Sequence, residues 1–359
     1  MLGWKLALQK NSALGVTPGL PYVSIVVPMR NESTFILKCL ESLKLQDYPY
    51  DCYEVMIVDG SSTDGSKELL ESFDFGKINL HLMENPLKIT PVALNIGVKA
   101  AKGDVIIILG AHTQVSSNFI KENIASLQRT GADCVGGLIQ TVGDSFIGKA
   151  IALALSNPFG IGNAKFRYST REEYVDTVAF PAFRREVFDK IGYFDESLAR
   201  NQDIEFSGRL RRNGGRILLS PSIKVTYYSP SSLMGLIRQS FANGWWNIYT
   251  FIKSPGSLMV RHFVPMLFVT GLIFSVLITP FNAMGLLFLI LILLPYLMFN
   301  LLMSIKISIN HGSLFFSVMP FVFFSLHVSY GIGSVVGMGR LFLSYIYKAL
   351  IQVFINFKK

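Results

Sequence analysis

The hydrophobic pattern divides the chain of 359 residues into two parts. Up to about residue 230, short apolar runs alternate with segments in which apolar residues recur every three or four positions. This is the pattern of strands alternating with amphipathic helices. From Phe263 to Gly339 the chain is almost wholly apolar, and Lys306 is its only Lys, Arg, Asp or Glu. We therefore expect an α/β domain followed by helices that span a membrane.

The most informative apolar run is VIIIL at residues 105–109, which is typical of a strand buried on both faces. Further strands are expected at residues 23–28, 54–59, 78–83, 132–141 and 177–183, with two short edge strands at 217–219 and 223–227. Helices are expected after a cap at Asn31 or Ser33, and at residues 65–73, 90–102, 116–129, 184–191 and 203–212. Residues 144–174 predict a helix and then a Gly/Asn-rich loop. Because strand and helix alternate four times from the start, the sheet is expected to be parallel with right-handed crossovers.

The C-terminal part predicts membrane helices. Residues 231–252 have helical spacing and include Trp245 and Trp246, and tryptophan favours the headgroup layer, so we expect an interfacial helix. A helix packed on the α/β domain would show the same pattern. Spans are expected at 263–279, 284–305 and 314–336, since roughly 20 residues cross a bilayer, and 341–357 predicts a short fourth span or an interfacial helix. The expected regions are a leader at 1–20, frayed or interfacial, an α/β domain at 21–230, interface helices at 231–262 and a membrane region at 263–359.

Net charge and cysteine usage limit the classes of binding partner and the cellular compartment that the sequence allows. The formal net charge of +9 suits a protein that lies against anionic membrane lipids. No dense Lys/Arg stripe interleaved with aromatic residues occurs, so nucleic acid is not an expected partner. The three cysteines are scattered and form neither a disulfide framework nor a zinc motif, which favours a reducing compartment for the α/β domain.

Polar residues follow the ends of three predicted strands and begin a late helix. They are PMRNE at 28–32, Asp59 with Asp64, GAHTQ at 110–114, and RNQDIE at 200–205. Because the carboxyl ends of parallel strands meet at one edge of a sheet, the first three groups should converge. Such an edge presents acids, an imidazole and an amide. These groups suit a divalent metal bridging a diphosphate, together with acceptors for a base and a ribose.

In this order and spacing, the chain resembles the family 2 inverting glycosyltransferases of the GT-A fold, and more closely the succinoglycan-biosynthesis type of membrane glycosyltransferase. The resemblance covers nearly the whole chain from about Pro21. It rests on VVPMRNE at 26–32, LESL at 40–43 with QDYP at 46–49, VDGSSTDG at 58–65, ALNIG at 93–97, GYFDE at 192–196 with RNQDIE at 200–205, RHFVP at 261–265 and SYGIG at 329–333. It implies an α/β domain with a doubly wound, mostly parallel sheet, followed by a transmembrane helix bundle.

The resemblance implies roles for the matching residues. Pro28, Arg30 and Glu32 would line the nucleotide pocket, with Glu32 near the ribose. Asp59 would accept a hydrogen bond from the base, and Asp64 would shape that loop.

The family's metal motif, aspartate-any-aspartate, falls on Gly110-Ala111-His112, which would lie beside the donor. Relatives of the succinoglycan type often have Asp-Ala-His here, so Gly110 departs from the pattern. His112 and Gln114 would then hold Mn²⁺ or Mg²⁺, weakened by the missing carboxylate, and imidazole tolerates Mn²⁺ better than Mg²⁺.

Asp203 matches the family's catalytic base, which takes the proton from the acceptor hydroxyl as that oxygen attacks the anomeric carbon. A helix cap is the structural alternative for Asp203, and Glu205 is either a partner for Arg209 or a catalytic group. Gln202 is a candidate for contact with the acceptor.

Four residues of the predicted interface helix are further candidates for sugar or acceptor contacts. Arg238, Gln239, Trp245 and Trp246 lie where processive relatives carry Gln-x-x-Arg-Trp. The arginine–tryptophan pair is absent here, which predicts one sugar added per acceptor. Membrane anchoring is the alternative role of the two tryptophans.

The resemblance thus implies an integral protein of the cytoplasmic membrane with its catalytic domain on the cytoplasmic face. It would move a sugar from a nucleotide-diphosphate donor to a hydroxyl of a lipid-linked saccharide in exopolysaccharide, capsule or O-antigen synthesis. A UDP-sugar is the first candidate for the donor. Two alternatives stay open: transfer to polyprenyl phosphate, which needs no base, and a catalytically silent membrane scaffold that binds nucleotide sugar, which Gly110 alone supports.

Overall fold

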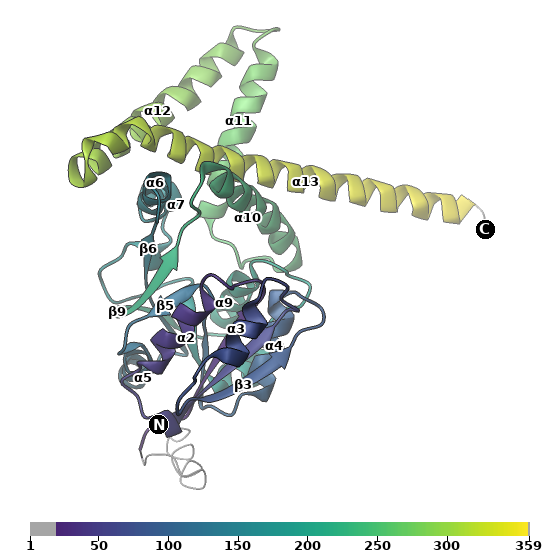
Figure 1. Ribbon diagram of the computed structural model, residues 1–359. Helices are drawn as coiled ribbons and strands as arrows, with labels where there is room; N and C mark the ends of the chain where they lie inside the picture. The colour runs from purple at the N-terminus through teal and green to yellow at the C-terminus, as the bar shows by residue number, and fades with distance from the viewer. Residues whose placement is uncertain (1–18, 358–359) are drawn as a thin grey trace. The chain divides into compact units, whose positions relative to one another are not determined.

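The computed structural model describes residues 19–357, which form two compact units. One unit contains the described residues up to Val142 together with Ala164–Tyr228. The other contains Gly143–Asn163 together with the chain from Ser229 onward (Figure 1). The leader expected at residues 1–20 lies outside the described residues, except for its last two positions.

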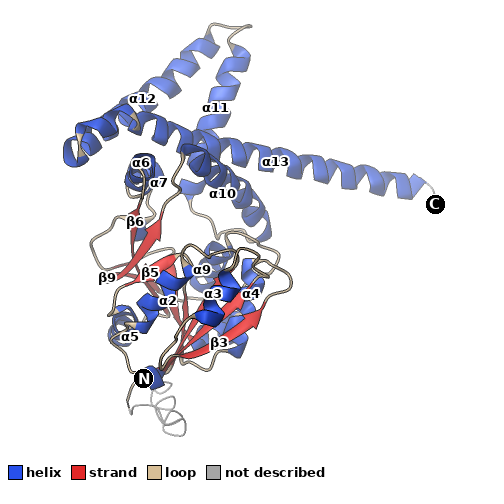
Figure 2. Cartoon of the chain, viewed as in Figure 1, coloured by secondary structure: helices blue, strands red, loops and turns tan. Residues whose placement is uncertain are grey.

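The first unit is a nine-stranded sheet with helices on both faces (Figure 2). Its strands are β1 (Val23–Met29), β2 (Tyr53–Asp59), β3 (Asn79–Glu84), β4 (Val105–Ile108), β5 (Thr113–Val115), β6 (Cys134–Val142), β7 (Glu173–Tyr174), β8 (Ala179–Arg184) and β9 (Ile217–Tyr228). Its helices are α2 (Ile36–Lys44), α3 (Ser66–Ser72), α4 (Thr90–Ala100), α5 (Phe119–Thr130), α8 (Arg185–Ile191) and α9 (Gln202–Arg212), with the 3-10 turns η2 (Tyr50–Cys52) and η3 (Lys165–Arg167).

The strand directions bring several strand ends to one edge. The order β3-β2-β1-β4 is parallel throughout, which confirms the expectation from the alternating pattern. The order continues β8-β6-β9-β5, and β8 is antiparallel to both β4 and β6. Consequently β6, and β9 parallel to it, run in the same direction as β4. The carboxyl ends of β1, β2, β4, β6 and β9 therefore lie along one edge of the sheet.

The central strands are buried on both faces, which explains their continuous apolar runs. Val27 and Ile107 belong to a core that includes residues of α2 and α5. Their neighbours Val26 and Ile106 belong to a second core with residues of α4, α8 and α9. This is the doubly wound arrangement that the sequence predicts.

The structure of β9 corrects one expectation. The sequence predicts two short edge strands at 217–219 and 223–227, but β9 is continuous and lies between β6 and β5. Pro221 has no N–H for the ladder, and the register between β6 and β9 shifts beside Gly137, so a bulge accommodates it. A Cβ at Gly137 would lie 2.1 Å from the carbonyl oxygen of Ile223, so the glycine permits this close approach.

The second unit consists of helices. They are α6 (Phe146–Leu155), α7 (Pro158–Ile161), α10 (Leu233–Lys253), η4 (Val260–His262), α11 (Val264–Ile278), α12 (Met284–His311), η5 (Ser313–Ser317) and α13 (Met319–Phe357). Within the described residues, three helical stretches are long and apolar enough to cross a membrane, at Val260–Ile278, Met284–His311 and Met319–Tyr347. They overlap the three spans expected from the sequence.

Residues 143–163 belong to this second unit, although they lie within the range 21–230 that the sequence predicts for the α/β domain. The reason is the apolar character of α6, whose Ile151 and Leu155 share a core with Val322 and Phe323 of α13. The α/β strand β6 therefore leads directly into a helix that packs with the C-terminal helices.

The last helix also differs from expectation. We expect a separate segment at 341–357, but α13 continues without a break through Phe357. Arg340 lies within this helix, and its guanidinium carbon is 5.3 Å from the ring centre of Trp245 on α10, a cation–π contact.

Close backbone packing joins α10 and α13. A Cβ at Gly244 would lie 2.0 Å from the carbonyl oxygen of Tyr330, and a Cβ at Gly333 would lie 2.1 Å from that of Phe241. The helix expected at 231–252 is therefore present and packed in this unit, while its position at a membrane interface stays a prediction.

Candidate active site

The loops that follow β1 and β2 hold each other in place. Asn31 has a positive φ of 55°, and its side-chain oxygen accepts a 2.8 Å hydrogen bond from the Thr63 N–H. The Ser33 N–H donates to a carboxylate oxygen of Asp64 at 3.0 Å. These bonds correct the expectation that Asn31 or Ser33 caps α2, which begins at Ile36 without a side-chain cap.

Two carboxylates are fixed within the second loop. Asp59 is only 5% exposed and accepts hydrogen bonds from the N–H of Ser62 at 3.2 Å and from its hydroxyl at 2.5 Å. Asp64 accepts from the hydroxyl and N–H of Ser66, and these bonds, with that from Ser33, hold the pKa of Asp64 well below its ordinary value. Because a carboxylate has about four lone-pair sites, Asp59 retains capacity to accept a further donor.

Pro28 and Arg30 flank the same loop. Pro28 is paired in register with Val58 of β2. The Arg30 side chain covers Gly60, where a Cβ would lie 3.2 Å from it, and its Nη1 donates to the carbonyl of Lys88 at 3.3 Å. The residues expected to line a nucleotide pocket thus lie at the edge formed by β1 and β2.

Glu32 and His112, which are 80 positions apart in the chain, lie in contact at this edge. Nδ1 of His112 lies 3.1 Å from Oε1 of Glu32. The His112 ring also packs edge-on against Tyr227 at the end of β9, with ring centres 5.7 Å apart. The pair offers one carboxylate and one imidazole to a metal. Among the described residues, no group of three or more His, Cys, Asp or Glu could hold a metal ion by itself.

The neighbours predicted for the metal motif do not join this pair. A Cβ at Gly110 would lie 3.3 Å from the Phe180 ring, so an aspartate there would need that ring to shift by a few tenths of an ångström. Phe180 itself has a φ of 49°, an uncommon conformation for a bulky residue. Ala111 is buried, and the side-chain oxygen of Gln114 accepts a 3.0 Å hydrogen bond from the Tyr228 hydroxyl. The amide oxygen expected to bind a metal is therefore already hydrogen-bonded.

Asp203 lies in the first turn of α9, after Asn201, whose φ is 62°. Although the residue keeps an exposed surface, the surrounding protein atoms desolvate its carboxyl and raise the pKa of Asp203 above its ordinary value. Its own N–H and that of Ile204 oppose this shift. In the described part of the chain, the side-chain oxygen of Gln202 has no hydrogen-bond partner. The start of α9 thus presents a basic carboxylate beside an unpaired amide oxygen.

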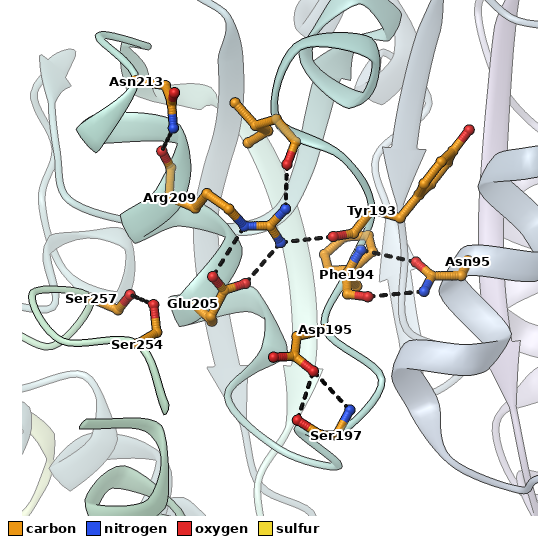
Figure 3. A network of polar contacts seen from close by, with 11 residues as sticks. Asn95, Tyr193, Phe194, Asp195, Ser197, Glu205, Arg209, Asn213, Ser254 and Ser257 are labelled. Carbon is orange, nitrogen blue, oxygen red and sulfur yellow. Dashed lines mark hydrogen bonds and ion pairs between the residues drawn. The ribbon is translucent and has the colours of Figure 1, made fainter. Parts of the chain in front are cut away.

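A polar network holds the turn that leads into α9 (Figure 3). Arg209 donates to both carboxylate oxygens of buried Glu205, at 3.1 and 2.8 Å, and to two main-chain carbonyls of the preceding turn. Asn95 of α4 bonds to both the carbonyl and the N–H of Phe194 at 2.9 Å. Glu205 is therefore a structural partner for Arg209, and the network ties the turn to both α4 and α9.

The remaining candidate residues lie on α10, in the second unit. The Trp245 ring makes the cation–π contact with Arg340 of α13. The Trp246 ring packs edge-on against Tyr249, with ring centres 5.6 Å apart. Arg238 is exposed on the same helix, and Gln239 is partly buried.

Sequence reasoning missed Tyr227 and Phe180, which flank His112 and Gly110. The signal for Tyr227 was available, since it ends a predicted strand, but only the direction of that strand places it at the same edge. For Phe180 no signal in the sequence indicates the positive φ.

Comparison with known proteins decides the family. A family model described as "Glycosyl transferase family 2" matches residues 24–192. The dolichyl N-acetyl-alpha-D-glucosaminyl phosphate 3-beta-D-2,3-diacetamido-2,3-dideoxy-beta-D-glucuronosyltransferase of Methanococcus voltae is 30% identical over 328 residues, which are 86% of this chain and 95% of that protein. The chain belongs to glycosyltransferase family 2. Succinoglycan biosynthesis protein ExoA of Rhizobium meliloti (strain 1021) is also 30% identical, over 73% of this family 2 chain and 79% of its own length.

A solved structure supports the fold. Mannosyltransferase PcManGT from Pyrobaculum calidifontis, in complex with GDP-Man and Mn²⁺, superposes with a TM-score of 0.56 at 17% identity, covering 92% of this chain and 95% of that one. This likeness concerns the fold alone. The family 2 protein is thus a glycosyltransferase with the GT-A fold, which confirms the resemblance carried by its motifs.

We predict that Arg209→Met destabilises the family 2 domain. The substitution removes the ion pair between Arg209 and buried Glu205, a loss that typically costs about 3–5 kcal/mol, and it removes two bonds to main-chain carbonyls. The midpoint of thermal unfolding of the purified protein in detergent measures the loss. The control is Arg212→Met, an exposed arginine on the same helix, and equal midpoints for the two variants would contradict the prediction.

Proposed function

We propose that this glycosyltransferase moves a sugar from a nucleotide-diphosphate donor, a UDP-sugar first, to a hydroxyl of a lipid-linked saccharide, with inversion at the anomeric carbon. The observation that carries the proposal is the contact between Glu32 and His112, which joins the end of β1 to the end of β4. It lies at the sheet edge that also holds the Asp59 loop, where open α/β sheets bind their ligands.

The acceptor class is supported by the relatives. The Methanococcus voltae protein is named as acting on a dolichyl-linked sugar phosphate, and the Rhizobium meliloti protein is named for succinoglycan biosynthesis. The three apolar helices suit an enzyme whose acceptor is held in a bilayer. Lys306 near the end of α12 supports a cytoplasmic location for the α/β domain through the positive-inside rule. An exopolysaccharide, capsule or O-antigen is the expected product.

The donor would lie along the ends of β1, β2 and β4. Asp59 would accept a hydrogen bond from the base, because its carboxylate is fixed yet retains lone pairs. Glu32 and His112 would hold a divalent metal, which supplies positive charge for the departing diphosphate. The two side chains form only part of a coordination shell, so donor oxygens would complete it. Imidazole favours Mn²⁺ over Mg²⁺, and the similar fold of PcManGT was solved with Mn²⁺.

Asp203 would act as the base. Its carboxylate accepts the proton of the acceptor hydroxyl while that oxygen forms the new bond to the anomeric carbon. The bond from this carbon to the diphosphate breaks, and its electron pair leaves with the diphosphate oxygen. A raised pKa makes Asp203 a stronger proton acceptor than an ordinary aspartate.

We predict that Asp203→Asn lowers kcat by about 10²–10⁴-fold, since the variant has no group to accept the proton. Donor-dependent glycosylation of a polyprenyl-linked saccharide measures this, with UDP affinity expected to stay unchanged. Asp189→Asn, an exposed position on α8, is the matched control. An Asp203→Asn enzyme that keeps its rate would favour transfer to polyprenyl phosphate, whose acceptor is already anionic.

The pH dependence of kcat tests the same base. Asp203 must be ionised to accept a proton, so activity should fall as the pH drops through its pKa in the folded enzyme. Because that pKa is raised above its ordinary value of 3.8, the acid limb should begin at a higher pH than for an exposed aspartate. A rate that stays constant down to about pH 4 would contradict the raised pKa.

Metal removal tests whether the protein is an enzyme or a catalytically silent scaffold. We expect EDTA to abolish transfer and Mn²⁺ to restore it better than Mg²⁺, because one metal ligand is an imidazole. His112→Ala should need several-fold more Mn²⁺ for half-maximal rate. UDP binding without metal dependence, combined with no turnover, would instead favour the scaffold.

A further inference from the structure

Two ion pairs hold the segment that precedes β7. Lys165 forms an ion pair with Glu173, which also accepts a 2.7 Å hydrogen bond from the Ser169 hydroxyl. Arg129 of α5 makes a two-pronged contact with Glu172, with one bond of 2.9 Å. These two ion pairs hold the segment against β7 and α5.

Arg167 differs from these neighbours. Its Nη1 donates to the Thr141 hydroxyl at 3.3 Å, and its guanidinium carbon lies 5.4 Å from the Tyr227 ring centre and 5.7 Å from that of Phe166. In the described part of the chain, no carboxylate pairs with it. A guanidinium has five N–H donors, and the Thr141 hydroxyl is the one protein acceptor found for them among the described residues, so several donors are left for a ligand or for water. Although Arg167 keeps some exposed surface, the surrounding protein atoms lower the pKa of Arg167, yet arginine stays charged, so it is a partly buried cation with no carboxylate partner among the described residues.

The position of Arg167 is defined by the sheet. Tyr227 of β9 lies in register with Thr141 of β6 and with Thr113 of β5. The same ring contacts His112, which in turn meets Glu32, so Arg167 and His112 both lie within 6 Å of the centre of one aromatic ring. The Arg167 guanidinium therefore lies at the edge where the donor is proposed to bind.

We propose that Arg167 binds a phosphate group of the substrate, and that this group is the diphosphate of the nucleotide-sugar donor. The inference rests on the proposed function. Guanidinium binds phosphate oxygens through two parallel hydrogen bonds, a geometry that lysine does not match. Gly110 leaves the metal motif one carboxylate short, and Arg167 supplies a fixed protein cation beside the same site. The phosphate of a lipid-linked acceptor has the same chemistry and is the other source that the experiment distinguishes.

The test uses the full chain purified in detergent. Isothermal titration calorimetry with UDP and with inorganic pyrophosphate compares the unsubstituted protein with Arg167→Gln and Arg167→Lys. Arg171→Gln, four positions along the same segment and exposed, removes the same charge and is the matched control. We expect Arg167→Gln to weaken both ligands by about tenfold or more, Arg167→Lys to lie between, and Arg171→Gln to stay within about twofold.

Kinetics and stability distinguish the remaining outcomes. If UDP and pyrophosphate bind normally to Arg167→Gln but the KM for the lipid-linked acceptor rises tenfold, the phosphate belongs to the acceptor. If both affinities and this KM are unchanged, the assignment of Arg167 is wrong. Should Arg167→Gln fail to fold, as judged by its thermal unfolding, Arg167→Lys decides, because unchanged affinities in a folded lysine variant would overturn the two-bond contact. A protein that binds pyrophosphate through Arg167 but transfers no sugar would refute the proposed function alone.

Discussion

The candidate site depends on one constraint, the common direction of β1, β2, β4, β6 and β9. A strand end delivers its loop to only one edge of a sheet, and the antiparallel insertion of β8 restores the direction of β4 in β6 and β9. If β6 and β9 ran the other way, Thr141 and Tyr227 would lie at the opposite edge from His112. Hydrogen bonding in the sheet thus sets which side chains meet, before any of them takes part in chemistry.

Local patterns predicted the parallel half of the fold and the residues around it. The apolar runs of β1, β2 and β4 are buried on both faces, and each ends at polar residues, so their positions and shared edge follow from the sequence. The family motifs placed Glu32, Asp59 and His112 in one neighbourhood, and the structure brings these loops to one edge. The three apolar helices were equally clear, because their composition is set by the bilayer rather than by their neighbours.

What the sequence did not reveal depends on contacts between distant segments. The continuity of β9 across Pro221 needs a bulge opposite Gly137, and α6 joins the C-terminal helices only because their apolar side chains are complementary. Nothing in the sequence distinguishes Arg167 from Lys165 and Arg129, and only the structure shows that these two pair with Glu173 and Glu172 while Arg167 has no carboxylate partner among the described residues. In each case the local residue types were known, but their partners were set by tertiary packing.

The excursion of residues 143–163 into the helical unit has a consequence for how the protein can be divided. The backbone passes between the two units at residues 142–143, 163–164 and 228–229, so no single cut separates them. A truncation after Tyr228 would leave α6 joined to the sheet with Ile151 and Leu155 stripped of their apolar neighbours, a surface prone to self-association. A soluble catalytic fragment would need two alterations, removal of the C-terminal helices and replacement of this apolar excursion by a short polar linker.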